Sequence, residues 1–387
     1  MSARLPEPDR GRLTELFLEL TAIRSPSGQE AGVAGFVVGR LRHLGLTVEE
    51  DAAAAEVGGD SGNLLCLVDG DGTEPRVALG AHMDTVALSD AAEPYLEDGV
   101  FYNRRPAILG ADDKAAVAAL LHATELLMAT AETFPTYELF FTVGEEIGLL
   151  GAKFLVKSGG LRSRLAAIFD SSGEVGGIVV RAPSRNGLYA TFHGRAAHAG
   201  LEPEQGRSAI HAAAKAVAAM QLGRVDVLTT ANIGIIRGGT ATNIIPDLCY
   251  LEGECRSHDD ARLAEVTAGM VDAIQLGATE VGVDVDVQVV NDFRSFALKE
   301  RSQPVRLAKR ALKELGLKPV LLTSEGASDA NILNAAGLPT VNLACAMRQV
   351  HTPNECMVLE DLVKLTRLAM ALVMDSSGHR DRDERGE

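Results

Sequence analysis

The order of short apolar segments and helical patterns constrains the fold of this chain most strongly. Near-continuous apolar runs, such as "NLLCLV", "RVALGAHMD", "TYELFFTVGEE" and "LAAIFD", alternate with patterns that predict helices at 113–130 and 147–158. Strands that are apolar on both faces and alternate with helices are typical of an α/β sheet covered on both sides. We therefore predict an α/β domain with its strands buried at the centre.

The middle of the chain follows a different order. From about residue 183 to 291 the pattern reads strand, helix, strand, strand, helix, strand, with helices expected at 207–222 and 259–279. This βαββαβ order is typical of a ferredoxin-like α+β unit with an antiparallel sheet. The α/β pattern then returns, with helices expected near 301–316 and 359–374. One domain is therefore predicted to be inserted into another.

These changes of pattern divide the chain into four regions. The α/β domain is expected at 1–182 and 292–375, the inserted domain at 183–291, and a disordered polar tail at 376–387. A length of 387 residues favours two domains over one. A hydrophobic content of 46% with 23% charged residues is that of an ordinary globular protein.

Charge and cysteine usage limit the partners and the compartment. The formal net charge of −16 argues against nucleic acid and anionic membranes as partners, because both are bound through basic patches. The five cysteines are scattered without a CxxC pair, which indicates free thiols in a reducing compartment. The N-terminus lacks the pattern of a signal peptide, and the longest apolar stretch, 115–131, carries His122 and Glu125. We therefore expect a cytoplasmic protein without a membrane span.

The segment "SPSGQEAG" carries a signal for the start of a helix. Ser27 is followed three residues later by Glu30, and this spacing predicts a capping box. We therefore expect these two side chains to cap a second helix, which follows a first helix at 9–22.

Side chains that commonly bind metals follow four of the predicted strands. One predicted strand ends at His82 and Asp84, the next is followed by Glu145 and Glu146, and a third ends at Asp170. The fourth strand, in "PTVNLACAMRQVH", is followed by a loop that contains His351. Two further acids, Asp112 and Asp113 in "GADDK", lie where a loop becomes a helix. Open α/β sheets bind ligands at the carboxyl ends of their strands, so these residues can converge. So many carboxylates in one place would repel one another unless a cation lay between them.

Each of these residues has a simpler interpretation when it is taken alone. A histidine at a strand end is more often structural than a ligand, and an aspartate before a helix is usually an N-cap. The number and placement of the residues favour a metal site. Two histidines with several carboxylates suit zinc, manganese or cobalt better than calcium or magnesium, which prefer oxygen ligands.

The spacing of these residues assigns roles to them. Alternate residues of a strand point to the same face, so Asp84 can accept the N–H of the His82 imidazole and fix the ring. Neighbouring residues point apart, so one of Glu145 and Glu146 can bind metal while the other faces the open side. The unbound carboxylate can then act as a general base on a water molecule.

Seven motifs in order resemble those of the co-catalytic dizinc exopeptidases. They are "GAHMDTV", "GADDKAAVA", "TVGEEIGLLGA", "IFDSSGEVG", "GRAAHAG", "ATNIIPD" and "VHTPNE". This family includes peptidase T, glutamate carboxypeptidase, aminoacylase and succinyl-diaminopimelate desuccinylase, and the resemblance spans about residues 10–374. The sequence is most similar to the peptidase T branch, judged by "GADDK", "TVGEEIG" and Asp170. The resemblance implies a mixed-sheet, phosphorylase/hydrolase-like catalytic domain at 1–182 and 292–375.

The same resemblance implies a set of metal ligands and a catalytic base. One metal ion would be held by His82, Asp112 and Asp170, and a second by Asp112, Glu146 and His351, so that Asp112 bridges two ions. Zinc is the expected metal, with cobalt or manganese as alternatives. Glu145 would be the general base, with Asp84 supporting the site. The peptide bond between Asp112 and Asp113 would be cis.

For the inserted domain, the resemblance implies a lid that also forms a homodimer. His198 would reach the neighbouring subunit's active site and stabilise an oxyanion there, while Asn243 and Arg256 would bind the carbonyl or carboxylate of the substrate. A loop at 325–329, with Gly326 and Ser328, would line the substrate pocket. Ala327 departs from the family pattern, because a second glycine is common at its position. His198 and Arg256 also allow simpler interpretations, as a turn histidine and a surface charge.

Three functions follow from these expectations. The first is an aminopeptidase that removes the N-terminal residue of tripeptides, which the likeness to peptidase T and the presence of Asp170 favour. The second is a deacylase or carboxypeptidase that uses the same dinuclear site on N-acyl amino acids or dipeptides. The third is a binding protein without catalysis, against which the intact Glu145 argues.

Overall fold

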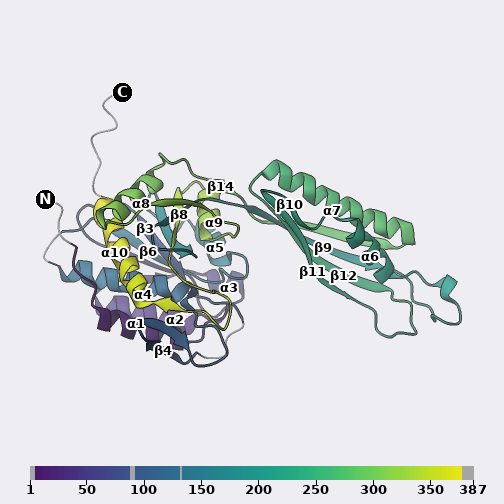
Figure 1. Ribbon diagram of the computed structural model, residues 1–387, viewed down its shortest axis with the longest axis horizontal. Coiled ribbons are helices and arrows are strands. Elements are labelled where there is room, and N and C mark those ends of the chain that lie inside the picture. The colour runs from purple at the N-terminus through teal and green to yellow at the C-terminus, as the bar shows by residue number, and fades with distance from the viewer. Residues whose placement is uncertain (1–4, 88–91, 131–132, 377–387) are drawn as a thin grey trace, which may run out of the picture. The chain divides into compact units, whose positions relative to one another are not determined.

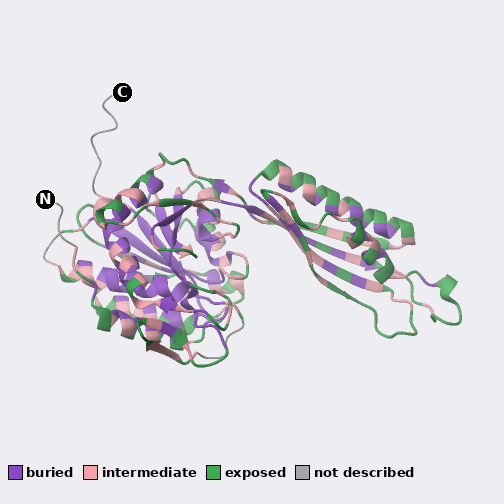
Figure 2. Cartoon of the chain, in the orientation of Figure 1, coloured by how far each residue is buried: buried purple, intermediate pink, exposed green. Residues whose placement is uncertain are grey.

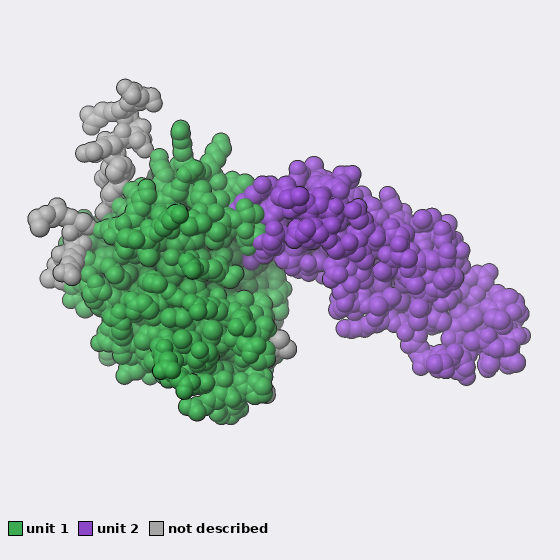
Figure 3. Space-filling view, viewed as in Figure 1, with its two compact units in different colours: residues 1–180, 297–324, 328–387 green, residues 181–296, 325–327 purple. Residues whose placement is uncertain are grey.

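The computed structural model describes residues 5–87, 92–130 and 133–376. The chain divides into two compact units (Figure 3). The large unit comprises Met1–Val180, Ala297–Ser324 and Ser328–Glu387, and the inserted unit comprises Arg181–Phe296 with Glu325–Ala327. The predicted tail at 377–387 lies outside the described residues, while Ser376 ends the last helix by donating its backbone N–H to the Leu372 carbonyl.

The largest sheet has nine strands of mixed direction (Figure 1). In spatial order they are β1 (Val48–Glu50), β2 (Leu64–Val68), β6 (Tyr137–Thr142), β3 (Ala78–His82), β7 (Ala166–Ser171), β16 (Thr340–Ala344), β8 (Gly177–Ala182) and β14 (Phe296–Ala297), with β15 (Val320–Thr323) paired to β8. The four neighbouring strands β6, β3, β7 and β16 run parallel to one another. Their carboxyl ends therefore lie along one edge of the sheet.

Helices bury the central strands of this sheet. They are α1 (Arg10–Ala22), α2 (Ala31–His43), α3 (Ala53–Val57), α4 (Ala111–Ala129), α5 (Leu150–Ser158), α8 (Gln303–Glu314), α9 (Asp329–Ala335) and α10 (Leu359–Asp375). Helix α4 packs against α1, α10 and the strands β3 and β7, while α5 packs against α3 and α9. Every residue of β3, β6 and β16 is buried (Figure 2), as expected for strands covered on both faces. The predicted α/β fold with a mixed sheet is confirmed.

One short sheet was not expected from the sequence. Strands β4 (Pro94–Glu97), β5 (Val100–Asn103) and β17 (Met357–Val358) form a three-stranded antiparallel sheet in the large unit. Strand β17 directly precedes α10, so this sheet ties the start of the last helix to the segment before α4. The strands are two to four residues long, which is too short for an alternating pattern to be recognised in the sequence.

The predicted capping box at the start of the second helix is wrong. Glu30 is the N-cap residue of α2, but neither Ser27 nor Glu30 caps this helix with its side chain; Asp60 accepts the N–H of Ala31 at its start instead. The Ser27 hydroxyl donates instead to the Asp84 carboxylate, and Glu30 Oε1 accepts the backbone N–H groups of Gly28 and Gly144. Both side chains are drawn away from the helix by loops at the strand ends, which a local sequence pattern cannot reveal.

The inserted unit is an antiparallel sheet with two long helices. Its elements are β9 (Ser184–His193), a 3₁₀ turn at Pro203–Gln205, α6 (Ala209–Ala219), β10 (Gly223–Asp226), β11 (Thr229–Gly238), β12 (Leu248–Ser257), α7 (Asp260–Val281) and β13 (Asp284–Phe293). The strand order is β10-β11-β12-β9-β13, so the ferredoxin-like order of four strands is extended by the short edge strand β10.

The two helices of the inserted unit cover one face of this second sheet. Leu188, Ala190 and Phe192 of β9 are buried in a core with residues of α6 and α7. The residues between them on the strand, Tyr189 and Thr191, point to the opposite face, because side chains alternate along a strand. Within the described residues, no helix has the length and apolar character needed to cross a membrane.

Candidate active site

The side chains predicted to bind metal gather at the carboxyl ends of the four parallel strands. His82 is the last residue of β3, Asp170 lies near the end of β7, and Glu145 and Glu146 follow β6 after a two-residue turn. His351 lies on the loop after β16. Because β6, β3, β7 and β16 are neighbours in the sheet, residues from distant parts of the chain meet at one edge.

Asp112 lies between the two histidines at the start of α4. Its Oδ1 is 3.2 Å from His82 Nε2, and its Oδ2 is 3.2 Å from His351 Nε2. Each carboxylate oxygen therefore faces a different histidine. This is the arrangement that a carboxylate bridging two metal ions requires.

The remaining two predicted ligands complete the two sets. Glu146 Oε1 lies 2.9 Å from His351 Nε2, and Asp170 Oδ1 lies 3.9 Å from His82 Nε2. Asp170 is held by Asn342 of β16, whose side-chain amide accepts the Asp170 backbone N–H and donates to its carbonyl at 2.6 Å. Two donors that bind one tetrahedral zinc ion lie about 3.4 Å apart. The distances between these side chains, 2.9 to 3.9 Å, bracket that spacing.

A compact group of three donors supports the same conclusion. The ligand atoms of His82, Asp112 and Glu146 all lie within 4.8 Å of one another. His82 belongs to the first predicted ligand set, Glu146 belongs to the second, and Asp112 is the predicted bridge between them. The two sets are therefore close enough to form a single dinuclear centre.

The ring of His82 is oriented by Asp84, although not in the way that the sequence predicts. His82 Nδ1 lies 3.0 Å from the backbone carbonyl of Asp84 and 3.4 Å from its carboxylate. The carbonyl is the better acceptor by distance, so it fixes the tautomer in which Nε2 is free to bind metal. The prediction that the carboxylate is the principal partner is corrected, while the role of Asp84 in orienting His82 is retained.

The carboxylate of Asp84 instead holds the loop that carries the two glutamates. Asp84 Oδ1 accepts the backbone N–H of Glu145 at 3.0 Å, and Oδ2 accepts that of Glu146 at 3.1 Å. Ser27 donates its hydroxyl to Oδ2 at 2.6 Å. Burial would raise the pKa of Asp84, but the neighbouring His82 ring, together with the hydrogen bonds from Ser27 and Glu145, holds this pKa below the usual value, so the group is charged.

Glu30 supports the residue just before the glutamates. Its Oε1 accepts the backbone N–H of Gly144 at 3.0 Å and that of Gly28 at 2.9 Å. Gly144 has a φ of +60°, and a Cβ at this position would lie 3.1 Å from a methyl carbon of Val57. A glycine is therefore favoured at this turn, and Glu30 fixes its orientation.

The start of α4 is held by buried carboxylates. Glu355, in the motif "VHTPNE", accepts the backbone N–H of Gly110 at 2.7 Å and that of Asp112 at 3.0 Å. Asp113 accepts the backbone N–H of His82 at 3.2 Å. The peptide bond between Asp112 and Asp113 is cis, as the family resemblance implied.

Burial and mutual repulsion shift the pKa values of the acidic side chains in the site. Burial and the Asp170 carboxylate raise the pKa of Glu145 well above its usual range, and burial raises that of Asp170 likewise. Hydrogen bonds to Asp112 and Glu146 raise the pKa of His351 to about 10. Burial would raise the pKa of Asp112, but its contacts with His351 and His82 lower it. The acids outnumber the histidines, so divalent cations would relieve the repulsion.

Asp329 is a buried acid of the same region that the sequence analysis missed. Its Oδ2 accepts the Thr142 hydroxyl, and burial raises its pKa to about 6. Its Oδ1 has no hydrogen-bond partner among the described residues. Asp329 follows Ser328 in the predicted pocket loop "EGASD", and that position was the available signal.

The two residues predicted to line the substrate pocket in this loop are Gly326 and Ser328. Ser328 is buried and caps α9 together with Asn331, while Gly326 belongs to the inserted unit.

The three predicted substrate-contacting residues of the inserted unit lie in two places. His198 and Asn243 lie on adjacent exposed loops, which are joined by a hydrogen bond from the Ala199 N–H to the Asn243 carbonyl. His198 Nδ1 accepts the backbone N–H groups of Gly200 and Leu201, so a neutral ring carries its proton on Nε2. Arg256, on β12, forms two hydrogen bonds to Glu254. A substrate carboxylate would therefore have to compete with Glu254 for Arg256.

Comparison with known proteins relates the whole chain to one peptidase family. The family model "Peptidase family M20/M25/M40" matches residues 78–375. A relative from Bacillus subtilis, the uncharacterized protein YqjE, is 38% identical over 95% of this chain and 98% of its own length.

Two solved structures resemble both units. The aminopeptidase PepT from Bacillus cereus is 38% identical with a TM-score of 0.84, covering 96% of this chain and 99% of its own. A tripeptidase from Staphylococcus aureus is 36% identical with a TM-score of 0.90, covering 97% of this chain and 100% of its own. With the ligand geometry described above, these matches place the chain among the metal-dependent hydrolases. The chain belongs to peptidase family M20/M25/M40.

Proposed function

We propose that this protein is a dinuclear metallo-aminopeptidase that removes the N-terminal residue from tripeptides. The observation that carries the proposal is the position of Asp112, whose two carboxylate oxygens face His82 and His351 at 3.2 Å each. The choice of tripeptides rests on the likeness to PepT from Bacillus cereus and to the tripeptidase from Staphylococcus aureus.

The donors fit two divalent metal ions. His82, Asp112 and Asp170 would hold one ion, and Asp112, Glu146 and His351 the other. Two imidazoles and three carboxylates favour zinc, with cobalt or manganese as alternatives. When bound, such a pair of ions supplies Lewis acidity that polarises the scissile carbonyl and makes the attacking water more acidic.

Glu145 is the proposed general base. Its backbone is fixed by Asp84, and its side chain is placed among acids that raise its pKa. A raised pKa matches a carboxylate to proton transfer near neutral pH. Glu145 would take a proton from the attacking water and later deliver it to the leaving amine. Asp84 would act through the loop and through His82 rather than on the substrate.

The inserted unit would contribute oxyanion stabilisation and dimerisation. The Nε2–H of His198 is directed away from its own turn, because Nδ1 is occupied by two backbone donors. It can therefore donate to the oxyanion of a tetrahedral intermediate, in the neighbouring subunit of a homodimer. Asn243, which lies on the loop beside His198, would bind the substrate carbonyl. Arg256 would bind a carboxylate after release from Glu254.

The cysteines support a location in the cytoplasm. All five are free, and four of them are buried. Proteins of oxidising compartments commonly use cysteines in disulfides, whereas reducing compartments keep them as thiols. The protein would therefore act on short peptides inside the cell.

A product assay tests the proposed reaction. Zinc- or cobalt-loaded protein would be mixed with an unblocked tripeptide and, separately, with its N-acetylated form, and the products identified by mass spectrometry. Release of the N-terminal residue from the unblocked peptide alone is expected. Cleavage of the acetylated compound would contradict the proposal and indicate a deacylase or carboxypeptidase with the same site.

A variant of the base separates catalysis from metal binding. Glu145→Ala should reduce turnover by at least a thousandfold while two metal ions per chain remain bound, because Glu145 is not among the proposed ligands. Metal content would be measured by elemental analysis beside the activity. Loss of both ions from this variant would refute the assignment of Glu145 as base.

A further inference from the structure

The inserted unit carries a pocket on the face of its sheet that is opposite to its helices. It has a volume of about 590 Å³ and is lined by residues of β9, β11 and β12 together with Gly239, Thr240 and Asp247 of the β11–β12 connection. This volume is in the range of sites that hold small molecules. None of the residues proposed above for metal binding or catalysis lines the pocket.

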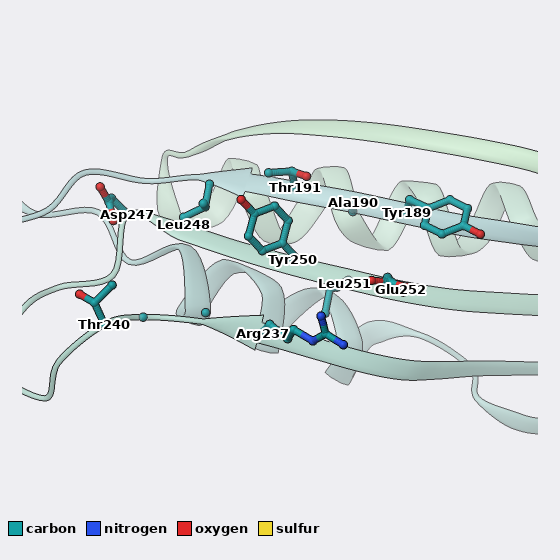
Figure 4. A pocket seen from close by; sticks show the side chains of 12 residues that line it. Tyr189, Ala190, Thr191, Arg237, Thr240, Asp247, Leu248, Tyr250, Leu251 and Glu252 are labelled. Carbon is teal, nitrogen blue, oxygen red and sulfur yellow. The ribbon is translucent and has the colours of Figure 1, made fainter. Parts of the chain in front are cut away.

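The floor of the pocket carries two tyrosines. Tyr189 of β9 and Tyr250 of β12 are 39% and 43% exposed, and they point to the same face of the sheet (Figure 4). Tyr250 is opposite Thr191 in the strand pairing, and Glu252 is opposite Tyr189, so the two rings are diagonal neighbours. Leu248 extends this apolar surface. Partly exposed aromatic rings of this kind accept an apolar or aromatic side chain.

Two opposite charges flank the rings, and neither is neutralised. Arg237 of β11 is opposite Tyr250, and Glu252 is two residues farther along β12 on the same face. Within the described part of the chain, neither side chain has a hydrogen-bond or ion-pair partner, although both line the same pocket. Arg185 and Arg256 of the same face differ from Arg237, since both are paired with Glu254. Arg237 and Glu252 can therefore bind groups of a ligand without breaking an internal pair.

We propose that this pocket binds a short zwitterionic peptide, of which a dipeptide with apolar side chains is the simplest case. The carboxylate would bind the planar fork of Arg237, the ammonium group would bind Glu252, and a side chain would lie on Tyr189 and Tyr250. Opposite charges on the two sides of an aromatic floor match the two ends and the body of such a molecule. The site goes beyond the proposed reaction and does not depend on it.

Binding is tested with L-phenylalanyl-L-phenylalanine on the zinc-loaded protein by isothermal titration calorimetry. Arg237→Ala and Glu252→Gln should each weaken binding at least tenfold, while Arg224→Ala should leave it unchanged. Arg224 is a matched control, because it is also an exposed arginine and lies on the edge strand of the same sheet. Circular dichroism would show that each variant keeps its fold. Binding that is equal in the parent protein and Arg237→Ala would overturn the proposal.

Blocked peptides assign each end of the ligand to its residue. The C-terminal amide should bind the parent protein more weakly than the free dipeptide, and this difference should vanish in Arg237→Ala. The N-acetyl form should likewise bind the parent protein more weakly than the free dipeptide does, and this difference in affinity should vanish in Glu252→Gln. A penalty for amidation that persists in Arg237→Ala would overturn the assignment of the carboxylate.

Two further measurements separate this pocket from other sites. In Asp112→Ala, which removes the proposed metal bridge, binding of the dipeptide to the pocket should persist, and its loss there would assign the signal to the metal centre and overturn the proposal. Tyrosine fluorescence reports on the pocket directly, because the chain has no tryptophan and two of its five tyrosines line this pocket. A change in oligomeric mass in Arg237→Ala, without a change in dipeptide binding, would identify the face as a protein interface instead.

Discussion

The hydroxyl of Ser27 donates a hydrogen bond of 2.6 Å to the carboxylate of Asp84. The same carboxylate accepts the backbone N–H groups of Glu145 and Glu146 and lies beside the ring of His82. A residue from the N-terminal segment thus fixes the group that positions the proposed base and two proposed ligands. Asp84 is fully buried, so each hydrogen bond to its carboxylate offsets part of the cost of burying a charge.

Replacement of Ser27 by alanine should lower kcat by about tenfold and leave the protein folded. Loss of one donor frees Asp84 to move, and groups that orient metal ligands typically contribute ten- to a hundredfold to activity or metal affinity. Ser61→Ala is a matched control, because Ser61 also donates its hydroxyl to a carboxylate, that of Glu50. Equal activity losses in the two variants would indicate a general effect on packing and would contradict the positioning role.

Replacement of Asp112 by alanine should remove both metal ions. The two oxygens of Asp112 face the two histidines separately, so the bridge is shared by both proposed ligand sets. Elemental analysis after gel filtration should find the metal content reduced from two ions per chain to near zero. Asp375→Ala, which removes a carboxylate at the end of α10, should retain both ions. A fully loaded and active Asp112→Ala would disprove the bridging role.

The fold and the main site residues could be predicted because their signals are local or repeated. The apolar runs before His82 and Asp170 mark buried strands, and parallel neighbours bring their ends together. The seven motifs then assign roles by resemblance. These signals depend on the order of residue types along the chain, and no three-dimensional contact was needed to read them.

The supporting contacts could not be predicted, because they join residues that are far apart in sequence. Ser27 and Glu30 have the spacing of a capping box, yet they bind groups 57 and 114 residues away. The sequence places Asp84 beside the His82 ring, but it cannot show whether the backbone carbonyl or the carboxylate of Asp84 lies nearer to Nδ1. Asp329 was missed because its burial and its contact with Thr142 depend on the packing of α9.

Replacement of Asp329 by asparagine should move the acidic limb of the kcat/KM profile to lower pH. Asp329 is one of the carboxylates that raise the pKa of Glu145, after burial and Asp170. Removing a negative charge stabilises the ionised form of a neighbouring acid, so the pKa of Glu145 falls. The change would be read from pH profiles of the parent and variant enzymes. A structural effect alone would lower the activity at every pH and leave the limb in place.

Metal loading near pH 7 should release protons, and metal affinity should rise with pH. In the metal-free protein, hydrogen bonds to Asp112 and Glu146 raise the pKa of His351 to about 10, and contacts with Asp112 and Asp84 outweigh burial to raise that of His82. Both rings are therefore protonated at pH 7, although metal binds only the neutral imidazole.

Zinc titrations by calorimetry in buffers of different ionisation enthalpy would count the released protons. At least two protons per chain are expected at pH 7, one from each histidine, and any proton held by Asp170, whose pKa burial raises, would add to this number. His351→Asn should reduce the number by about one, since its side chain carries no proton to displace. Proton release that is absent in the parent protein, or unchanged in this variant, would show that His351 is not charged before the metal binds.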